Sequence, residues 1–426
     1  MLLKNATCVT FDPQKVFKAD LQIEGGKITA VAPAINAKNQ KGNYDLKGRL
    51  LLPGFVCAHT HLYSALARGM PGPETPPTDF KQILEKVWWK LDAALDEPMI
   101  RASALVGAIE AVKAGTTTLI DHHSSPGFIR GSLSAIDNVL ENVGLRRVVC
   151  YEITDRGGDL ALHEMLKESN DFLETKRPPL SKAMVGAHAP FTLSDPTMER
   201  CGHLAAKFDC GVHIHLAEDG TDPYESQMYF SVLVTERLRR AGLLNSKSIL
   251  AHCVGLGAVD RAAIIEAGAW MVHNPRSNMN NRVGRAQVEA FNKSATLGTD
   301  GIGADMLEEL KTAYYRGHEE TGSDATTYLR ILANNHRLAA AIFDQPIGKI
   351  EVGAPADLIV LDYDSPTPLT SENLPWHVVF GWSSALIDSV MIGGKWIMRK
   401  RRFVSVDVER AYREAREQAD RLWSKL

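Results

Sequence analysis

Histidines and acidic residues recur at short spacings along the middle of the chain, where their side chains could hold a metal ion. His59 and His61 stand two residues apart, and His215 is followed closely by Glu218. Residues i and i+2 of a β-strand point to the same face, so His59 and His61 can share one ion. Imidazole suits Zn²⁺ or Fe²⁺. With the imidazole of His215 and the carboxylate of Asp300, we expect one divalent metal and an open position for water, as in catalytic sites.

These side chains come at the ends of apolar segments that alternate with helical patterns, such as residues 98–114 before Gly115. That alternation favours parallel βαβ units. Barrel enzymes carry their sites at the carboxyl ends of such strands. We predict an α/β fold, a TIM-like (β/α)₈ barrel; the alternative is an open doubly wound sheet, but no Gly-x-Gly-x-x-Gly follows the first strand. The expected strands are Pro53–His61, Thr116–His123, Arg146–Thr154, Ala183–Ala189, Gly211–Glu218, Ser248–Val254, Ala269–Pro275 and Ala295–Gly301.

Both ends of the chain contain short alternating segments with hairpin turns, at Gly25-Gly26 and at Gly393-Gly394. Neither end has enough strands to cover its own apolar face, so we expect the two to combine into one small β-sandwich. The expected division is therefore 1–54 for the first half of the sandwich, 55–347 for the metal-dependent barrel, 348–404 for the second half and 405–426 for a C-terminal helix.

The composition is typical of a globular protein, with 45% hydrophobic residues, 23% charged residues and a net charge of −3. The one short basic run, Arg399–Arg402, favours a hairpin over a nucleic-acid site. The six cysteines form no Cys-x-x-Cys pair, and no apolar stretch reaches the length of a membrane span. The N-terminus lacks the features of a signal peptide. We expect a cytoplasmic protein, a homodimer, that takes a small-molecule substrate and binds neither nucleic acid nor membrane.

The motifs around these residues resemble those of the amidohydrolase superfamily along essentially the whole chain. They are His59-Thr-His61, His215-Leu-Ala-Glu218, Ala251-His252-Cys253 and Gly298-Thr-Asp300-Gly301. The chain is most similar to the deaminase branch, which contains chlorohydrolases, cytosine deaminases and S-adenosylhomocysteine deaminases. Within this branch, the chain resembles the SsnA-type aminohydrolases. The motifs that carry this resemblance are Asp121-His-His-Ser-Ser-Pro126, Asn274-Pro-Arg-Ser-Asn-Met-Asn-Asn281 and Gly301-Ile-Gly-Ala-Asp-Met306.

The resemblance implies that His59, His61, His215 and Asp300 hold the metal. It also implies that Glu218 moves protons, that His252 polarises the reacting centre and that Asp300 orients the water. A carboxyl group at Glu218, where the chain turns over the metal, can carry a proton to a substrate nitrogen. No lysine stands at the end of the fourth strand, where two-metal members carry one, so we expect a single metal.

Four further residues are candidates for contact with substrate. We expect His188 to touch it. His122, like His123, could line the pocket or support its wall, and Trp88 could roof the pocket or pack against the barrel. Arg276 could pair with a carboxylate or carbonyl of the substrate, or could form a structural ion pair.

A hydrolytic deaminase is the function we expect, releasing ammonia from a purine, a pyrimidine, a pterin or a similar heterocycle. The alternative is a hydrolase that opens a cyclic amide such as an imidazolone or hydantoin, and a non-catalytic scaffold is disfavoured by the complete ligand set. Deamination releases ammonia and ring opening does not, so that product distinguishes the two enzymes.

Overall fold

Parallel strands and helices alternate through the middle of the chain, as the sequence predicts. In the computed structural model, which describes residues 1–36 and 42–426, these strands form two parallel sheets, ordered β6-β7-β8-β9 and β10-β11-β12-β13-β14. The strands are β6 (Phe55–Thr60), β7 (Thr116–His123), β8 (Arg146–Tyr151), β9 (Ser181–Ala183), β10 (Val185–Ala187), β11 (Val212–Leu216), β12 (Ile249–His252), β13 (Trp270–His273) and β14 (Ala295–Leu297).

The two sheets join at both edges and close into a barrel. Only Met184 separates β9 from β10, so these two strands occupy one position of the barrel. Parallel bridges connect Ile153 with Ala187 at one edge and Thr60 with Asp300 at the other. The backbone N–H of Thr299 also donates to the carbonyl of His59, at 2.8 Å. The expected eight-position barrel is therefore confirmed.

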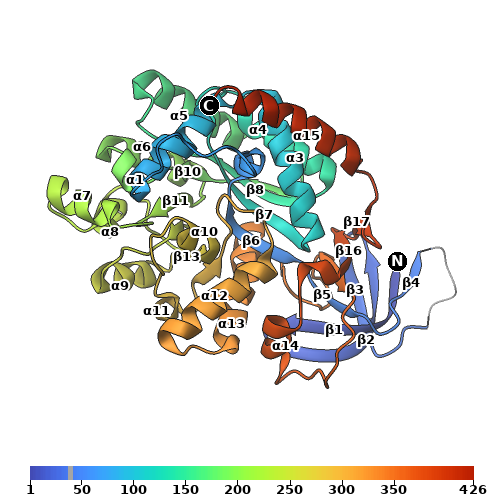
Figure 1. Ribbon diagram of the computed structural model, residues 1–426. Helices are drawn as coiled ribbons and strands as arrows, with labels where there is room; N and C mark the ends of the chain where they lie inside the picture. Colours follow the sequence, from blue (N-terminus) through green and yellow to red (C-terminus); the bar gives the residue numbers. More distant parts are fainter. Residues whose placement is uncertain (37–41) are drawn as a thin grey trace.

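Helices surround the barrel on the outside (Figure 1). Strands such as β7 and β8 are buried along their whole length because their side chains face either the barrel interior or this helical layer. The main outer helices are α3 (Glu97–Lys113), α4 (Ser132–Val143), α5 (Gly158–Glu174), α6 (Asp195–Lys207), α8 (Val234–Arg240), α9 (Ala258–Ala267), α12 (Met306–Thr321) and α13 (Ala325–Phe343).

Shorter helices lie in the connections, several of them near the carboxyl ends of the strands. They are η1 (Leu62–Ala67), α1 (Phe80–Ile83), η2 (Leu84–Trp88), α2 (Trp89–Ala94), η3 (Pro190–Thr192), α7 (Thr221–Phe230), α10 (Pro275–Asn280), α11 (Val288–Phe291), α14 (Leu374–Phe380) and η4 (Ser384–Leu386).

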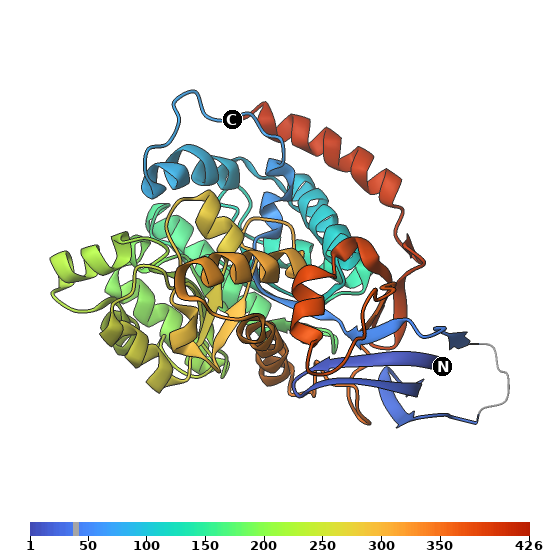
Figure 2. The same ribbon diagram turned by 60° about the horizontal axis from the view of Figure 1, so that its bottom comes forward.

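The two ends of the chain form one sheet beside the barrel, with strands from the start of the chain and strands from its end side by side (Figure 2). The join is the antiparallel pair β5–β15, in which Leu52 faces Ile359. The strands are β1 (Leu2–Phe11), β2 (Gln14–Glu24), β3 (Lys27–Ala32), β4 (Asn43–Asp45), β5 (Leu50–Pro53), β15 (Leu358–Leu361), β16 (Ile387–Ile392), β17 (Lys395–Arg399) and β18 (Arg402–Phe403).

This sheet differs in detail from the expected sandwich, because its strands are hydrogen-bonded in one continuous order. The sheet curls so that β3, at one end, reaches the segment before β15: the N–H of Ile28 donates to the carbonyl of Ala354 at 2.9 Å. Ile28 and Met391, from strands far apart in the sheet, belong to one apolar core. The curled sheet buries the apolar faces of both terminal segments against each other. The sandwich was predicted because neither segment can cover its apolar face alone.

The chain ends in α15 (Val408–Trp423), which packs against α3. Its Trp423 indole donates to the carbonyl of Leu66, at 2.9 Å. Among the described residues, no helix combines the length and the apolar character that a membrane span requires.

A buried ion pair ties the terminal sheet to the barrel. Arg146, at the start of β8, donates from Nε to the carboxylate of Asp357 at 2.7 Å, and both side chains are almost wholly buried. The second oxygen of Asp357 accepts the backbone N–H of Gly393, at 2.7 Å. One carboxylate therefore connects the barrel to the hairpin of β16 and β17.

We predict that Asp357→Ala destabilises the protein by about 3–5 kcal/mol, because it leaves the guanidinium of Arg146 buried without its partner. Urea unfolding followed by circular dichroism measures the change. The matched control is Asp362→Ala, which breaks the surface pair of Asp362 with Arg49 at 3.0 Å and should cost less than about 1 kcal/mol. Equal losses in the two variants would show that Asp357 does not connect the two parts.

Candidate active site

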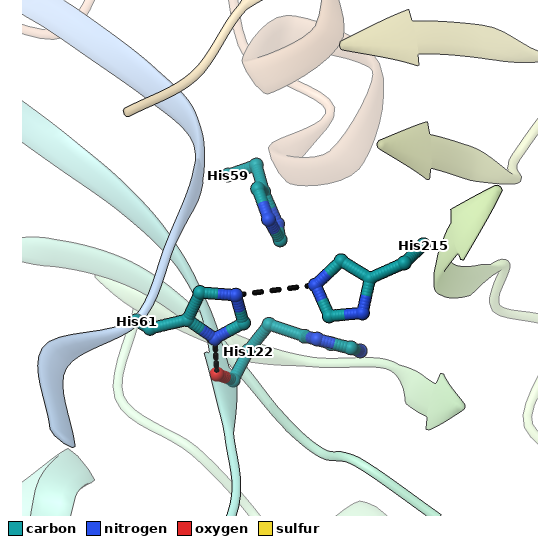
Figure 3. A group of neighbouring side chains, drawn as sticks. All are labelled: His59, His61, His122 and His215. Atoms are coloured by element: carbon teal, nitrogen blue, oxygen red, sulfur yellow. Dashed lines mark hydrogen bonds between the residues drawn. The ribbon is translucent and has the colours of Figure 1, made fainter. Parts of the chain in front are cut away.

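Four histidine side chains converge inside the carboxyl end of the barrel (Figure 3). His59 lies on β6 and His61 directly follows it, while His122 lies on β7 and His215 on β11. The Nε2 atoms of His61 and His215 lie 3.1 Å apart. Two neighbouring strands and one on the far side of the barrel therefore point imidazoles at a common centre.

The carboxylate of Asp300 completes this cluster from the segment after β14. Its Oδ1 lies 2.9 Å from Nε2 of His61 and 3.4 Å from Nε2 of His59. The potential ligand atoms form two overlapping sets, each within 4.8 Å: one contains His59, His61, His122 and His215, and the other His59, His215, His252 and Asp300. The cluster thus offers a site for a divalent metal ion.

Hydrogen bonds to the backbone orient the imidazoles toward the centre. Nδ1 of His61 lies 2.5 Å from the carbonyl of His122, and Nδ1 of His215 lies 2.9 Å from the carbonyl of His188. A carbonyl can only accept, so each Nδ1 carries the proton and each Nε2 is left as a free lone pair. Such fixed tautomers are typical of histidines that bind metal.

His59 meets the chemical requirements of a metal ligand. Its Nδ1 lies 2.8 Å from Nε2 of His213, and its own Nε2 is buried without a hydrogen-bond partner. Burial lowers the pKa of His59 to about 3 and the pKa of His215 well below its usual value. Both imidazoles are therefore neutral, the form that coordinates a metal. His213, buried in the barrel interior, holds His59 in place.

His122 lies behind the cluster. Its Nε2 lies 3.0 Å from the carbonyl of His213, and its Nδ1 lies 3.2 Å from Oε1 of Glu152. Its ring is completely buried and is absent from the residues that line the pocket in front of the cluster. Of the two roles left open for His122, this position favours support of the wall.

Glu218 and His252 face each other at the edge of the cluster, with 3.4 Å between Oε2 and Nε2. Asn281 donates to the other oxygen of Glu218 at 3.1 Å, and Nδ1 of His252 lies 2.8 Å from the side-chain oxygen of Asn278. Burial raises the pKa of Glu218 well above its usual value, and the charge of Asp300 adds to the rise. A carboxyl group in such a setting can both accept and release a proton near neutral pH.

A pocket opens in front of the cluster, with about 680 Å³ of space including its mouth. That size lies within the range of sites for small molecules. His188 and Trp88, both candidates from the sequence, lie in its wall together with Trp89, Phe191 and Glu218. Aromatic side chains therefore face a space at whose base the metal ligands converge.

Arg276 is placed elsewhere. Its guanidinium forms ion pairs with Glu309 and, at 2.8 Å, with Glu308, and it donates to the carbonyl of Gly303. It lines a separate groove at the surface, not the pocket. Of the two alternatives for Arg276, the structure shows the ion pair.

Glu152 is a site residue that the sequence analysis missed. It follows β8, is 2% exposed and lies in the pocket wall. Its Oε1 is 3.2 Å from Nδ1 of both His61 and His122, and its Oε2 is 3.9 Å from Nε2 of His188. The available signal was a lone acidic residue near the end of an otherwise apolar strand, the third strand, for which no site residue was proposed.

Comparison with known proteins agrees with this site. The chain matches the Amidohydrolase family over residues 50–397. It is 30% identical to a 5-methylthioadenosine/S-adenosylhomocysteine deaminase of Aquifex aeolicus, over 100% of this chain and 98% of the relative. It is 29% identical to a 5'-deoxyadenosine deaminase of Methanobrevibacter smithii, over 99% and 98% of the two chains.

Solved structures share the fold at lower identity. An adenosine deaminase from Xanthomonas campestris with bound zinc superposes with a TM-score of 0.86 at 24% identity, covering 99% of this chain and 98% of that one. A triazine hydrolase variant superposes with a TM-score of 0.85 at 20% identity, covering 98% and 99%. Since the family match spans most of the chain and the relatives align from end to end, this protein belongs to the amidohydrolase family.

Proposed function

We propose that this protein is a metal-dependent hydrolytic deaminase that releases ammonia from an aminated heterocycle, with the 6-amino group of an adenosine-type nucleoside as its target. The observation that carries the proposal is the arrangement of His59, His61, His215 and Asp300 around one point, with Glu218 beside it in the pocket wall. The deaminases aligned along the whole chain support the choice of an adenosine-type substrate.

We assign His59, His61, His215 and Asp300 as the ligands of a single metal ion, and propose zinc, which suits three imidazoles and one carboxylate. The free Nε2 atom of His59 and the neutral state of the buried rings of His59 and His215 support this assignment. Zinc, when bound, supplies Lewis acidity and brings the pKa of a water near to neutrality.

Glu218 carries the proton. Its carboxylate accepts a proton from the attacking water and delivers it to the amino group of the substrate. Ammonia then leaves as a neutral molecule; without that transfer the leaving group would be an amide anion. The hydrogen bond from Asn281 holds one oxygen of Glu218, so the other is the one that faces His252 and the pocket.

His252 and Asp300 orient the reacting groups. The contact with Asn278 fixes the ring of His252 so that its Nε2 faces Glu218, 3.4 Å away, where the ring orients the groups at the reacting centre. Ser277 donates to Oδ2 of Asp300, which leaves Oδ1 directed at His59 and His61. The aromatic walls, Trp88 and Phe191 among them, contact the flat ring of the substrate and exclude water around it.

We predict about one zinc ion per purified chain by elemental analysis, and a loss of that zinc in His61→Ala because a ligand is removed. His273→Ala is the matched control: His273 is a buried histidine at the end of β13 that belongs to neither ligand set. Two metal ions per chain in the wild type, or unchanged zinc in His61→Ala, would contradict the assigned ligands.

We predict that the wild type releases ammonia from 5'-deoxyadenosine and that Glu218→Gln lowers kcat by about 10²–10⁴-fold, because the amide cannot carry the proton. The zinc content should stay at the wild-type level, which separates proton transfer from metal binding. Glu266→Gln, an exposed change on α9, is the control and should retain activity. A kcat near the wild-type value in Glu218→Gln, with chemistry as the slow step, would show that Glu218 does not carry the proton. If the protein opens a cyclic amide and releases no ammonia, the alternative function, a cyclic-amide hydrolase, replaces the deaminase.

A further inference from the structure

Among its described lining residues, the substrate pocket contains many acidic side chains and, apart from three histidines, no basic one. Among the described residues that line it there is neither a lysine nor an arginine. Six carboxylates belong to its lining: Asp92, Glu152, Glu218, Asp219, Asp222 and Asp300. The charge of the pocket therefore depends on which of these six are neutralised by other groups.

The nearest arginines are already engaged. Arg156 lies 3.1 Å from the carboxylate of Asp92 and stacks over the ring of Trp89, with its guanidinium carbon 4.6 Å from the ring centre. Arg276 is bound by Glu308 and Glu309 outside the pocket. Both guanidinium groups therefore already face a carboxylate, and neither belongs to the lining of the pocket.

Other partners satisfy some of the acids. Asp222 accepts the backbone N–H groups of Ala217 at 2.7 Å and Phe191 at 2.8 Å, which places it in the frame of the pocket. Asp300 lies beside His59 and His61, and one oxygen of Glu218 accepts from Asn281. Asp92 has Arg156, whereas Glu152 and Asp219 pair with neither a lysine nor an arginine among the described residues.

Of Glu152 and Asp219, Glu152 is the acid with the better defined surroundings. Its side chain is buried, and Oε1 accepts no hydrogen bond. The two histidine nitrogens within 3.2 Å of that oxygen are close enough for an ion pair, but neither contact has hydrogen-bond geometry. For His61 the reason is visible, because its Nδ1 proton points to the carbonyl of His122. Glu152 is therefore a buried carboxylate in the pocket wall whose close neighbours are imidazoles, and its charge acts on the pocket from behind them.

We propose that the pocket selects its substrate by charge: it takes a flat heterocycle that is neutral or positively charged, and it rejects one with an anionic group, with Glu152 as a main determinant. The inference rests on the proposed deaminase function and narrows it. A buried carboxylate repels an anion strongly, since little water lies between the charges. A cation is favoured by the negative charge of Glu152 and by the aromatic side chains of Trp88 and Trp89 in the wall.

The substrates that are named for the relatives differ in charge. 5'-Deoxyadenosine and 5-methylthioadenosine carry no charge, whereas S-adenosylhomocysteine ends in an amino acid with a carboxylate. That end also carries an ammonium group, so the proposal disfavours its carboxylate alone, and a ligand with a single charge is needed to test the selection.

Three nucleosides of nearly equal size test the proposal: 5'-deoxyadenosine is neutral, 5'-amino-5'-deoxyadenosine is a cation and adenosine-5'-carboxylic acid is an anion. All three carry the same 6-amino group, so ammonia release reports the same reaction. We expect kcat/KM for the anion to lie at least about tenfold below that of the neutral nucleoside, because like charges oppose binding. The cation should equal or exceed the neutral compound.

The variant Glu152→Gln keeps the size of the side chain and removes its charge. We expect it to reduce the preference for the neutral nucleoside over the anion by at least about threefold, with unchanged zinc content. Asp209→Asn is the matched control, because it removes one negative charge from a side chain that is 93% exposed. The preference of this control for the neutral nucleoside over the anion should equal that of the wild type. A general effect of net charge would change the preference in the control as well.

An anion processed as well as the neutral nucleoside by the wild type overturns the proposal, whatever the variant does, and so does an unchanged preference in a folded Glu152→Gln. If none of the three compounds releases ammonia, the proposed function fails; the charge order is then read from dissociation constants of the same compounds, measured by calorimetry with the zinc-loaded wild type. Weaker binding of the anion supports the charge selection, and equal binding or no binding of all three overturns it.

Discussion

The direction in which each buried imidazole carries its proton is the constraint on which this site depends. The rings are buried, so one nitrogen must meet a fixed acceptor before the other can serve as a ligand. The carbonyl of His122 does this for His61, and the carbonyl of His188 does it for His215. Each carbonyl belongs to a segment beside the strand that bears the ligand, so the register of the barrel strands orients the ligand atoms.

The ends of the strands carry the strain that this arrangement requires. Ala217, His252, Cys253 and Asp300 all have positive φ angles between 49° and 75°, in the left-handed region that side chains other than glycine rarely adopt. With such a φ angle the chain turns sharply at the end of a strand. The side chains that follow the strand are thereby directed back toward the carboxyl end of the barrel. Since backbone strain of this kind costs about 1–3 kcal/mol per residue, the surrounding packing must hold it, which the fully buried strands and the helical layer provide.

The sequence predicts site residues where their spacing along one strand decides which face they share. It does not predict contacts that depend on residues far apart in the sequence. The spacing of His59 and His61 predicted a shared face, and β7 was expected with its observed bounds. The curled terminal sheet was not foreseen, because strand alternation defines apolar faces but not the order of strands. Glu152 was missed for a similar reason: no pattern tells whether one acid near a strand end enters a pocket or an ion pair. For Arg276 the sequence left a substrate contact and an ion pair both open. Its acidic partners, Glu308 and Glu309, lie more than 30 residues away in the sequence.

The buried position of Glu152 also bears on how a barrel built around a cation can reject anions. A metal ion attracts negative groups, so a pocket with only the metal and aromatic walls would favour anionic ligands. A carboxylate at the surface would not correct this, because water and salt screen its charge within about 10 Å. A carboxylate that is 2% exposed and beside the ligand histidines acts through a medium of low polarity instead. Placing the acid next to the metal site thus lets one pocket keep the Lewis acid for the reaction while its wall opposes the anions that the metal would attract.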